Sequence, residues 1–181
     1  MPHLWLFYQM QSGLTHIYTG NGKGKTTAAL GLCLRALGAG KRVCLVQFLK
    51  KGDFSELKAL RRFPNCTIRQ FGTSEFVDPK NVSIQQRAEA QKGLEFARKA
   101  ILCDPCDLLI LDEILVALQF KLLKLEDILN LVAAKPSRLE LVLTGRGAPQ
   151  ELIDAADLVS DIKEVKHPFQ KGIKARRGIE F

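Results

Sequence analysis

The sequence has no charged residue in its first 22 positions, where Lys, Arg, Asp and Glu are all missing. A secretory signal needs a basic segment before its apolar run, so this stretch does not match one. The apolar run Leu4–Tyr8 is much shorter than the ~20 residues that cross a bilayer. We therefore expect residues 1–13 to be an arm that packs on an apolar surface, with Met10 as an alternative start. We also expect a cytoplasmic protein without a membrane partner.

Histidine is rare, and paired cysteine motifs are scarce. The histidines are only His3, His16 and His167, and none is a compelling candidate for a catalytic base. The five cysteines are an odd number, which favours reduced thiols. Cys103 and Cys106 form a single C-x-x-C pair with no second pair, so a zinc site or a redox role has little support.

Internal repeats, linkers and aromatic ladders of the RNA-binding kind are also missing. The 181 residues, 46% hydrophobic and 25% charged, suit one globular domain. The net charge of +8 indicates an anionic partner, which ATP would satisfy as well as nucleic acid. The segment 166–177 has five cations and no acid, but apolar residues interrupt it, so we expect it to fold back over a site. A nucleic-acid-binding protein stays open as an alternative.

The most informative motif is the segment 19–27, TGNGKGKTT, between a strand pattern and a helix pattern. Glycines let backbone N–H groups approach phosphate oxygens, and a helix N-terminus adds unpaired donors and partial positive charge. Lys25 is expected to reach the outer phosphates, and the Thr26 hydroxyl to bind Mg²⁺. Thr19 stands where the usual P-loop pattern has its first glycine. We infer a nucleotide site.

Strand and helix patterns alternate along the rest of the chain. Strands are predicted at 14–18, 43–48, 67–71, 107–112, 139–144 and 158–165, and helices at 25–37, 55–62, 83–102, 125–134 and 149–156. This order predicts a three-layer α/β domain with a mostly parallel sheet. Ligands bind at the carboxyl ends of such strands.

Two further segments should reach that edge of the sheet. Asp112 ends a continuous apolar strand, where it can hold the Mg²⁺ shell, and Glu113 can polarise a nucleophile or support the metal. Arg146, in the turn after the next predicted strand, is a candidate for phosphate contact. Neither Lys25 nor Asp112 is expected to pack in the core.

Taken together, these residues resemble the ATP:corrinoid adenosyltransferases of the BtuR/CobO/CobP type. The segments that carry the similarity are Tyr18–Ala29, Val46–Phe48, Leu111–Ile114, Thr144–Pro149, Glu151–Val159, His167–Phe169, Gly172–Ala175 and Gly178–Phe181. In that family a threonine also replaces the first P-loop glycine. The family often has Gly-Phe-Thr-Trp where this chain has Ser74–Val77, and Phe76 keeps an aromatic ring there.

The resemblance implies a P-loop NTPase-like (RecA-like) domain over residues 14–181 that moves the 5′-deoxyadenosyl group of ATP to Co(I) of a corrinoid. The corrinoid would be cobalamin or cobyrinic acid a,c-diamide, and tripolyphosphate would leave. Expected partners are Mg²⁺ (or Mn²⁺), a reductase such as a flavoprotein, and a second copy in a homodimer, without nucleic acid.

The site residues follow from the motif and the resemblance together. Catalytic roles are expected for Lys25, Asp112 and Glu113, with Thr26 and Asp112 at the metal. ATP contacts are expected for Gly20, Asn21, Gly22, Lys23, Gly24, Lys25, Thr26, Thr27, Arg35 and Arg146, and corrinoid contacts for Phe76, His167, Phe169 and Lys174. A small ATPase or nucleoside kinase would use the same P-loop against the γ-phosphate, although no arginine-rich lid is visible.

Overall fold

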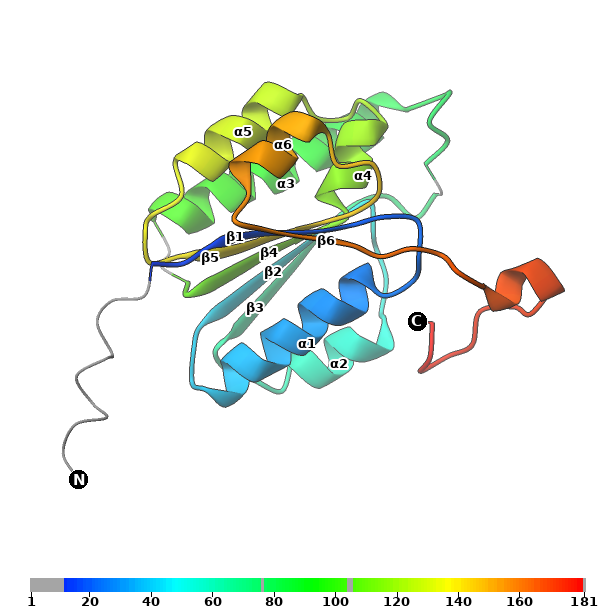
Figure 1. Cartoon of the computed structure of the whole chain (residues 1–181), viewed down its shortest axis with the longest axis horizontal. Coiled ribbons are helices and arrows are strands. Elements are labelled where there is room, and N and C mark those ends of the chain that lie inside the picture. Colours follow the sequence, from blue (N-terminus) through cyan, green and yellow to red (C-terminus); the bar gives the residue numbers. More distant parts are fainter. Residues whose placement is uncertain (1–11, 76, 104–105, 181) are drawn as a thin grey trace.

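A computed structural model describes residues 12–75, 77–103 and 106–180. These residues form a six-stranded sheet with helices on both faces (Figure 1). The strand order is β3-β2-β4-β5-β1-β6, and every pairing is parallel. The predicted three-layer α/β fold is thus confirmed, with a wholly parallel sheet in place of a mostly parallel one.

The elements follow one another in the predicted alternation. In chain order they are β1 (Thr15–Thr19), α1 (Lys25–Gly38), β2 (Val43–Phe48), α2 (Ser55–Leu60), β3 (Cys66–Phe71), α3 (Ile84–Leu102), β4 (Leu108–Asp112), α4 (Ile114–Gln119), α5 (Leu125–Ala133), β5 (Glu140–Thr144), α6 (Gln150–Ala155), β6 (Leu158–Asp161) and the short 3₁₀ turn η1 (Pro168–Lys171).

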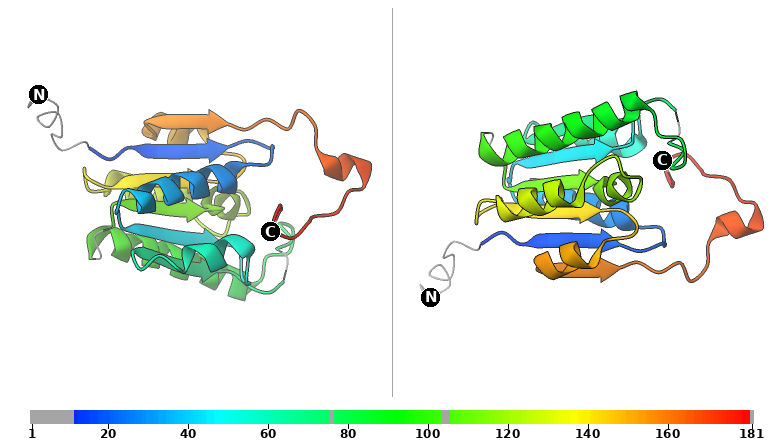
Figure 2. Two further views of the ribbon diagram at one scale, coloured as in Figure 1. Left: turned by 90° about the horizontal axis from the view of Figure 1, so that it is seen from below. Right: turned by 90° about the horizontal axis from the view of Figure 1, so that it is seen from above.

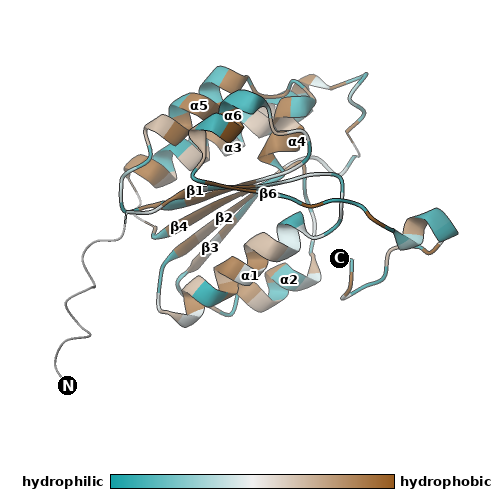
Figure 3. Cartoon of the chain, in the orientation of Figure 1, coloured by the Kyte–Doolittle hydropathy of each residue, from teal (hydrophilic) through white to brown (hydrophobic). Residues whose placement is uncertain are grey.

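Two apolar layers hold the sheet between its helices. Helices α1 and α2 cover one face, and α3 to α6 cover the other (Figures 1 and 2). Every residue of β2 and of β4 is buried, as expected for strands covered on both faces. Figure 3 shows these strands as apolar, whereas the helices present polar residues outward. The long apolar runs of the sequence therefore mark the centre of the sheet.

The start of α3 is set by local side-chain chemistry. The Ser83 hydroxyl accepts from the Gln86 backbone N–H at 3.1 Å, and the Gln86 side chain accepts from the Ser83 N–H at 3.0 Å. This reciprocal pair satisfies two backbone donors that a helix start leaves unpaired. The prediction that Ser83 caps this helix is confirmed.

Two elements differ from the sequence prediction. Strand β6 ends at Asp161, not at residue 165, because its partner β1 ends at Thr19, where the P-loop begins. Helix α4 is absent from the sequence prediction, since no side-chain hydrogen bond caps the start of its run ILVALQ. It starts after Glu113, which takes the left-handed backbone conformation (φ 63°) and so turns the chain sharply away from β4.

The C-terminal tail lies at the carboxyl edge of the sheet. The tail after β6 crosses in front of the carboxyl edge of the sheet and returns toward the start of α1 (Figure 2). Most of the predicted arm at 1–13 lies outside the described residues. Within the residues that are described, no helix is both long and apolar enough to cross a membrane.

Candidate functional site

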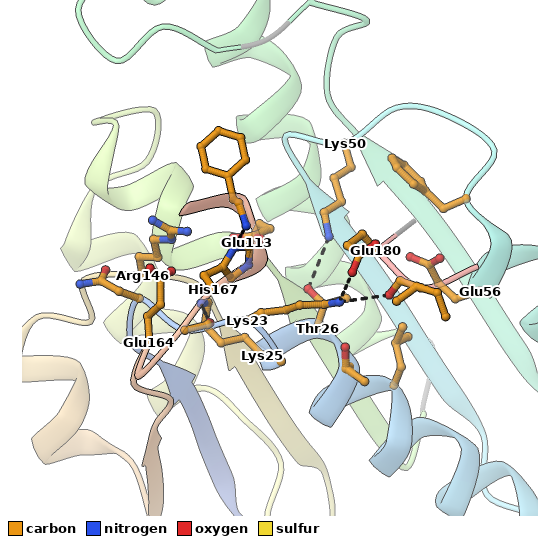
Figure 4. A pocket seen from close by; sticks show the side chains of 18 of the residues that line it. Lys23, Lys25, Thr26, Lys50, Glu56, Glu113, Arg146, Glu164, His167 and Glu180 are labelled. Atoms are coloured by element: carbon orange, nitrogen blue, oxygen red, sulfur yellow. Dashed lines mark hydrogen bonds and ion pairs between the residues drawn. The ribbon is translucent and has the colours of Figure 1, made fainter. Parts of the chain in front are cut away.

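A cavity of about 980 Å³ opens at the carboxyl edge of the sheet (Figure 4). Ligand pockets in proteins commonly measure ~300–1,000 Å³. The described residues that line it are Asn21, Gly22, Lys23, Gly24, Lys25, Thr26, Thr27, Leu30, Lys50, Phe54, Ser55, Glu56, Glu113, Arg146, Glu164, His167, Phe169, Gly178, Ile179 and Glu180. Segments distant in the sequence meet there, as predicted for the P-loop, Glu113 and Arg146.

Close approach of a second segment explains two glycines of the P-loop. A Cβ at Gly20 would lie 2.3 Å from the Asp161 carboxylate, and one at Gly22 would lie 2.6 Å from the Lys163 carbonyl oxygen. The Gly22 N–H donates to the Ile162 carbonyl at 2.7 Å. Strand β6 and the residues after it thus support the loop from outside, and only glycine fits at these contacts.

Lys25 is folded back onto its own loop. Its ammonium donates to the carbonyl oxygens of Gly20 at 2.7 Å and Gly22 at 2.8 Å. Burial lowers the pKa of Lys25, and the positive charge of Arg146 lowers it further. The side chain is buried, contrary to the expectation that it stays out of the core. Lys25 is therefore a cation held by two backbone carbonyls at the head of α1.

Asp112 is also buried, and protein donors surround its carboxylate. Oδ1 accepts from the hydroxyls of Thr26 at 2.8 Å and Thr144 at 2.7 Å. Oδ2 accepts from the Gln47 amide at 3.1 Å and the Lys50 ammonium at 2.7 Å. The expectation that Asp112 stays out of the core is wrong, because β5 lies between β4 and β1 and closes one side of it.

The chemistry of this group fits a magnesium ion. Mg²⁺ prefers oxygen ligands, keeps several waters, and is usually held by one or two protein carboxylates plus substrate phosphates. The Thr26 hydroxyl and the Asp112 carboxylate provide such oxygens, 2.8 Å apart, beside the P-loop.

Glu113 follows Asp112 in the chain and lines the cavity beside it. Its backbone N–H donates to the Thr144 hydroxyl at 3.0 Å, which fixes the turn between β4 and α4. Burial raises the pKa of the Glu113 carboxyl, as does the nearby charge of Asp112, and Lys50, Lys25 and Arg146 oppose this in part. Glu113 can therefore take or give a proton closer to neutral pH than an exposed glutamate.

Thr19 has a structural contact that the sequence pattern did not reveal. Its hydroxyl accepts from the Ala148 backbone N–H at 3.3 Å, which ties the P-loop strand to the turn that carries Arg146. In that turn Gly145 has φ 142°, and a Cβ there would lie 2.7 Å from Leu115. Arg146 itself is exposed and faces the cavity.

The tail closes the open side of the cavity. The Lys23 ammonium donates to the Glu180 carboxylate at 2.9 Å and to the Ile179 carbonyl at 3.3 Å (Figure 4). Arg176 donates to the same carboxylate from its backbone N–H at 2.7 Å and from its guanidinium at 3.1 and 3.2 Å. These charge-assisted contacts hold the pKa of Glu180 at about 2. The expected return of the tail toward the site is what the structure shows.

The remaining predicted residues divide into three groups. His167 and Phe169 line the cavity, with the His167 ring nitrogen accepting from the Phe169 N–H at 3.2 Å. Arg35 and Lys174 are not among the described residues of its lining. Arg35 lies ten residues along α1 from Lys25, roughly 15 Å at the helical rise. Phe76 lies outside the described residues.

The sequence patterns did not single out four charged side chains of the described cavity lining, which are Lys50, Glu56, Glu164 and Glu180. Lys50 belongs to none of the motifs that the sequence shows, although it follows a buried strand by two positions and so reaches the same edge as Asp112. Glu180 was noted only within a motif, and no local pattern pairs it with Lys23, 157 positions away. The sequence signal that could have found Lys50 is its position two residues after a central buried strand.

Comparisons with known proteins agree with this geometry. The family described as "ATP:corrinoid adenosyltransferase BtuR/CobO/CobP" matches residues 11–181. This match covers the P-loop, Asp112 and the tail together. The chain belongs to this family.

Two corrinoid adenosyltransferases are similar to this chain over most of their length. The chain is 35% identical to Corrinoid adenosyltransferase CobA of Salmonella typhimurium, over 96% of this chain and 88% of that protein. It is 37% identical to a corrinoid adenosyltransferase of Pseudomonas aeruginosa, over 94% and 85%. An uncharacterized protein of Nostoc is 39% identical over 87% of this chain, which spans 45% of the Nostoc protein.

The BtuR/CobO/CobP resemblance and the fold it implies are thereby confirmed. The three-layer parallel arrangement is that of a RecA-like P-loop protein, with the loop between the first strand and α1. Thr19, the departure from the usual P-loop pattern, is accommodated through its bond to Ala148.

Proposed function

We propose that this protein transfers the 5′-deoxyadenosyl group of ATP to the cobalt of a reduced corrinoid and releases tripolyphosphate. The observation that carries the proposal is family membership over residues 11–181, since those residues include both sides of the cavity. Co(I) would donate an electron pair to C5′ of the ribose. The C5′–O bond would break, and its electron pair would leave on the triphosphate.

The residues of this chain would act mainly on the leaving group. Negative charge grows on the departing oxygen, and fixed donors in a dry site stabilise such charge strongly. Lys25 and Arg146 are cations at this cavity, and the amides of the loop 21–25 and the start of α1 add donors. Release of Lys25 from the carbonyls of Gly20 and Gly22 would supply a cation to the phosphates.

Thr26 and Asp112 would hold Mg²⁺, which, when bound, supplies positive charge to the phosphate oxygens. Gln47 and Thr144 would hold the Asp112 carboxylate in place from the neighbouring strands. Their hydrogen bonds fix its orientation before any ligand arrives, and such preorganisation supports efficient stabilisation.

A catalytic base is not needed for this reaction, because the nucleophile is the substrate's own cobalt. Burial raises the pKa of Glu113, a carboxyl of the described cavity lining, and this suits it to proton transfer. Glu113 could therefore serve a hydrolase instead. Water attack on the γ-phosphate is therefore the competing reaction that a test has to distinguish.

We also propose contacts and partners that the family suggests. His167 and Phe169 line the cavity and are proposed to contact the corrinoid, together with Phe76 and Lys174. Arg35 is proposed as a nucleotide contact on the resemblance alone. The corrinoid would be cobalamin or cobyrinic acid a,c-diamide. A flavoprotein-type reductase would supply Co(I), and the enzyme would act as a cytoplasmic homodimer.

The experiment incubates the protein with ATP, Mg²⁺ and chemically reduced cobalamin without oxygen, and analyses both halves of the products. We expect tripolyphosphate and a light-sensitive alkyl-cobalamin spectrum in equal amounts, and neither without reductant. Accumulation of ADP and phosphate, with or without corrinoid, would overturn the proposal in favour of an ATPase or kinase.

A further inference from the structure

Lys50 occupies an unusual position at the buried end of the cavity. It lies two residues after β2, beyond Leu49, which takes a left-handed backbone conformation with φ 59°. Bulky residues rarely adopt this conformation unless the surrounding structure holds them there. The Leu49 N–H donates to the Phe71 carbonyl at 2.8 Å, which anchors the turn to β3. The turn delivers the Lys50 ammonium into the group around Asp112.

The ammonium contacts the same two side chains that fit a metal ion. Lys50 Nζ lies 2.7 Å from Asp112 Oδ2 and 3.5 Å from Thr26 Oγ1. Figure 4 shows it reaching toward Thr26. A unit positive charge therefore already stands beside the oxygens of Asp112 and Thr26.

The number of hydrogen bonds that the Asp112 carboxylate can accept decides what happens when an ion binds. A carboxylate has about four lone-pair sites. The hydroxyls of Thr26 and Thr144 donate to Oδ1, and Gln47 and Lys50 donate to Oδ2. The described donors thus fill the carboxylate. An ion that binds Asp112, directly or through its water, has to replace one of them.

Lys50 is the donor that can leave. Gln47 and Thr144 are fully buried in strands, and the Gln47 amide oxygen is held by Gln70 at 3.0 Å. Thr26 can keep donating its proton while its lone pair faces an ion. The Lys50 side chain is 24% exposed, lines the cavity, and has a flexible four-carbon stem.

We propose that Lys50 is a tethered counter-cation of Asp112, which gives up its place to the divalent ion and then binds the triphosphate. The assignment of the anion as triphosphate rests on the proposed function. The exchange keeps Asp112 paired with positive charge throughout, and it brings a cation to the phosphates at the step in which the metal arrives. Lys50 would touch substrate only after this exchange.

Two binding measurements on one variant test the proposal, and the two affinities are expected to change in opposite directions. In Lys50→Met, Mn²⁺ binding to the nucleotide-free protein, followed by electron paramagnetic resonance of free Mn²⁺, should tighten about tenfold, because the competing cation is gone. Binding of tripolyphosphate with Mg²⁺, measured by calorimetry, should weaken about tenfold or more, because a charged donor is lost.

Two further variants give the comparison its controls. Lys50→Arg keeps the charge, so its Mn²⁺ affinity should stay within about threefold of the parent value. Lys51→Met removes the adjacent exposed lysine, which is not part of the described cavity lining, and should leave both affinities unchanged.

The outcomes separate the possible roles of Lys50. Weakening of both ligands in Lys50→Met would indicate a structural role, and no change in either would indicate an idle side chain. Either result overturns the proposal. The measurements contain no corrinoid, so opposite shifts would support the exchange even if the product analysis rejected adenosyl transfer.

Discussion

Two of the carboxylates near the P-loop, those of Asp112 and Glu180, are held in different ways. Asp112 is fully buried at the end of a central strand, with donors from α1, β2, β5 and the turn after β2. Glu180 lies on the tail, with its side chain 21% exposed and with donors from Arg176 and Lys23. One is a fixed part of the core, whereas the other belongs to a segment with little buried surface of its own.

This difference indicates a division of the cavity into a rigid side and a lightly held side. The tail residues 163–180 are exposed or only partly buried, and their contacts are mainly charged. Segments with few buried apolar contacts open at low free-energy cost. A ligand can therefore enter by displacing the tail, while the Asp112 group keeps its geometry.

The largest effect is expected for Asp112→Asn. The change removes the charge that four donors surround, so the free energy of unfolding should fall by about 3 kcal/mol or more. Turnover should fall at least about 100-fold. Denaturant unfolding and product formation measure these, with Asp154→Asn, an exposed residue of α6, as the control. Parent-like values in both assays would contradict the central role of Asp112.

Lys25→Ala should impair turnover more selectively. Loss of one charge-stabilising donor should lower kcat by about 10²–10³-fold. The free energy of unfolding should fall by about 1–3 kcal/mol, because the carbonyls of Gly20 and Gly22 lose a charged donor. Lys41→Ala, at an exposed position, should change neither quantity. A normal kcat in Lys25→Ala would remove this residue from the proposed site.

Deletion of residues 166–181 tests the lightly held side. Nucleotide affinity, measured by calorimetry, should fall about tenfold, since the tail covers one wall of the cavity. The melting temperature should change by less than about 3 °C, because the sheet is left intact. If the tail were a nucleic-acid arm, nucleotide affinity would persist and only salt-sensitive RNA binding would be lost.

The smallest effect is expected for the Glu180 contact, and it depends on pH. Hydrogen bonds from Arg176 hold the pKa of Glu180 at about 2, below its ordinary value of 4.5. A depressed carboxyl pKa stabilises the folded arrangement of the tail, and its bond to Lys23, above pH 4.5, and that stabilisation is lost as pH falls through about 2. Carbon-13 NMR of the carboxyl group should report this titration.

Arg176→Met provides the matched comparison for that titration, since Arg176 is the largest cause of the shift. The apparent pKa of Glu180 should then move up toward 4.5. Thermal unfolding of the sheet should not change measurably, because exposed ion pairs contribute little to stability. If the Glu180 pKa stayed at about 2 in the variant, a donor other than Arg176 would be the main cause of the lowered pKa.

Much of this arrangement can be predicted from local sequence. The runs around Val46 and Ile110 are apolar without alternation, which indicates strands buried on both faces of a parallel sheet. The glycine spacing between Thr19 and Lys25 indicates a phosphate loop for reasons that involve only neighbouring residues. The order of strands and helices then places Asp112 and Arg146 at one edge.

Local sequence did not reveal α4 or the end of β6. The run from Ile114 has no side-chain cap, and the turn that starts α4 depends on a hydrogen bond from the Glu113 backbone N–H to the Thr144 hydroxyl. The end of β6 depends on where β1 ends, and that partner lies about 140 positions earlier in the chain. Both features are set by contacts between distant segments.

What the sequence by itself determined is the class of fold, the phosphate loop and the family, because each rests on short-range patterns or on motifs in order. The tertiary structure decided the partners of each charge. Lys50 reaches Asp112 because parallel register places Gln47 beside Asp112, and the chain turns back just after β2. Glu180 meets Lys23 because the tail returns across the sheet edge. Such pairings depend on distances in space, which no spacing along the chain encodes.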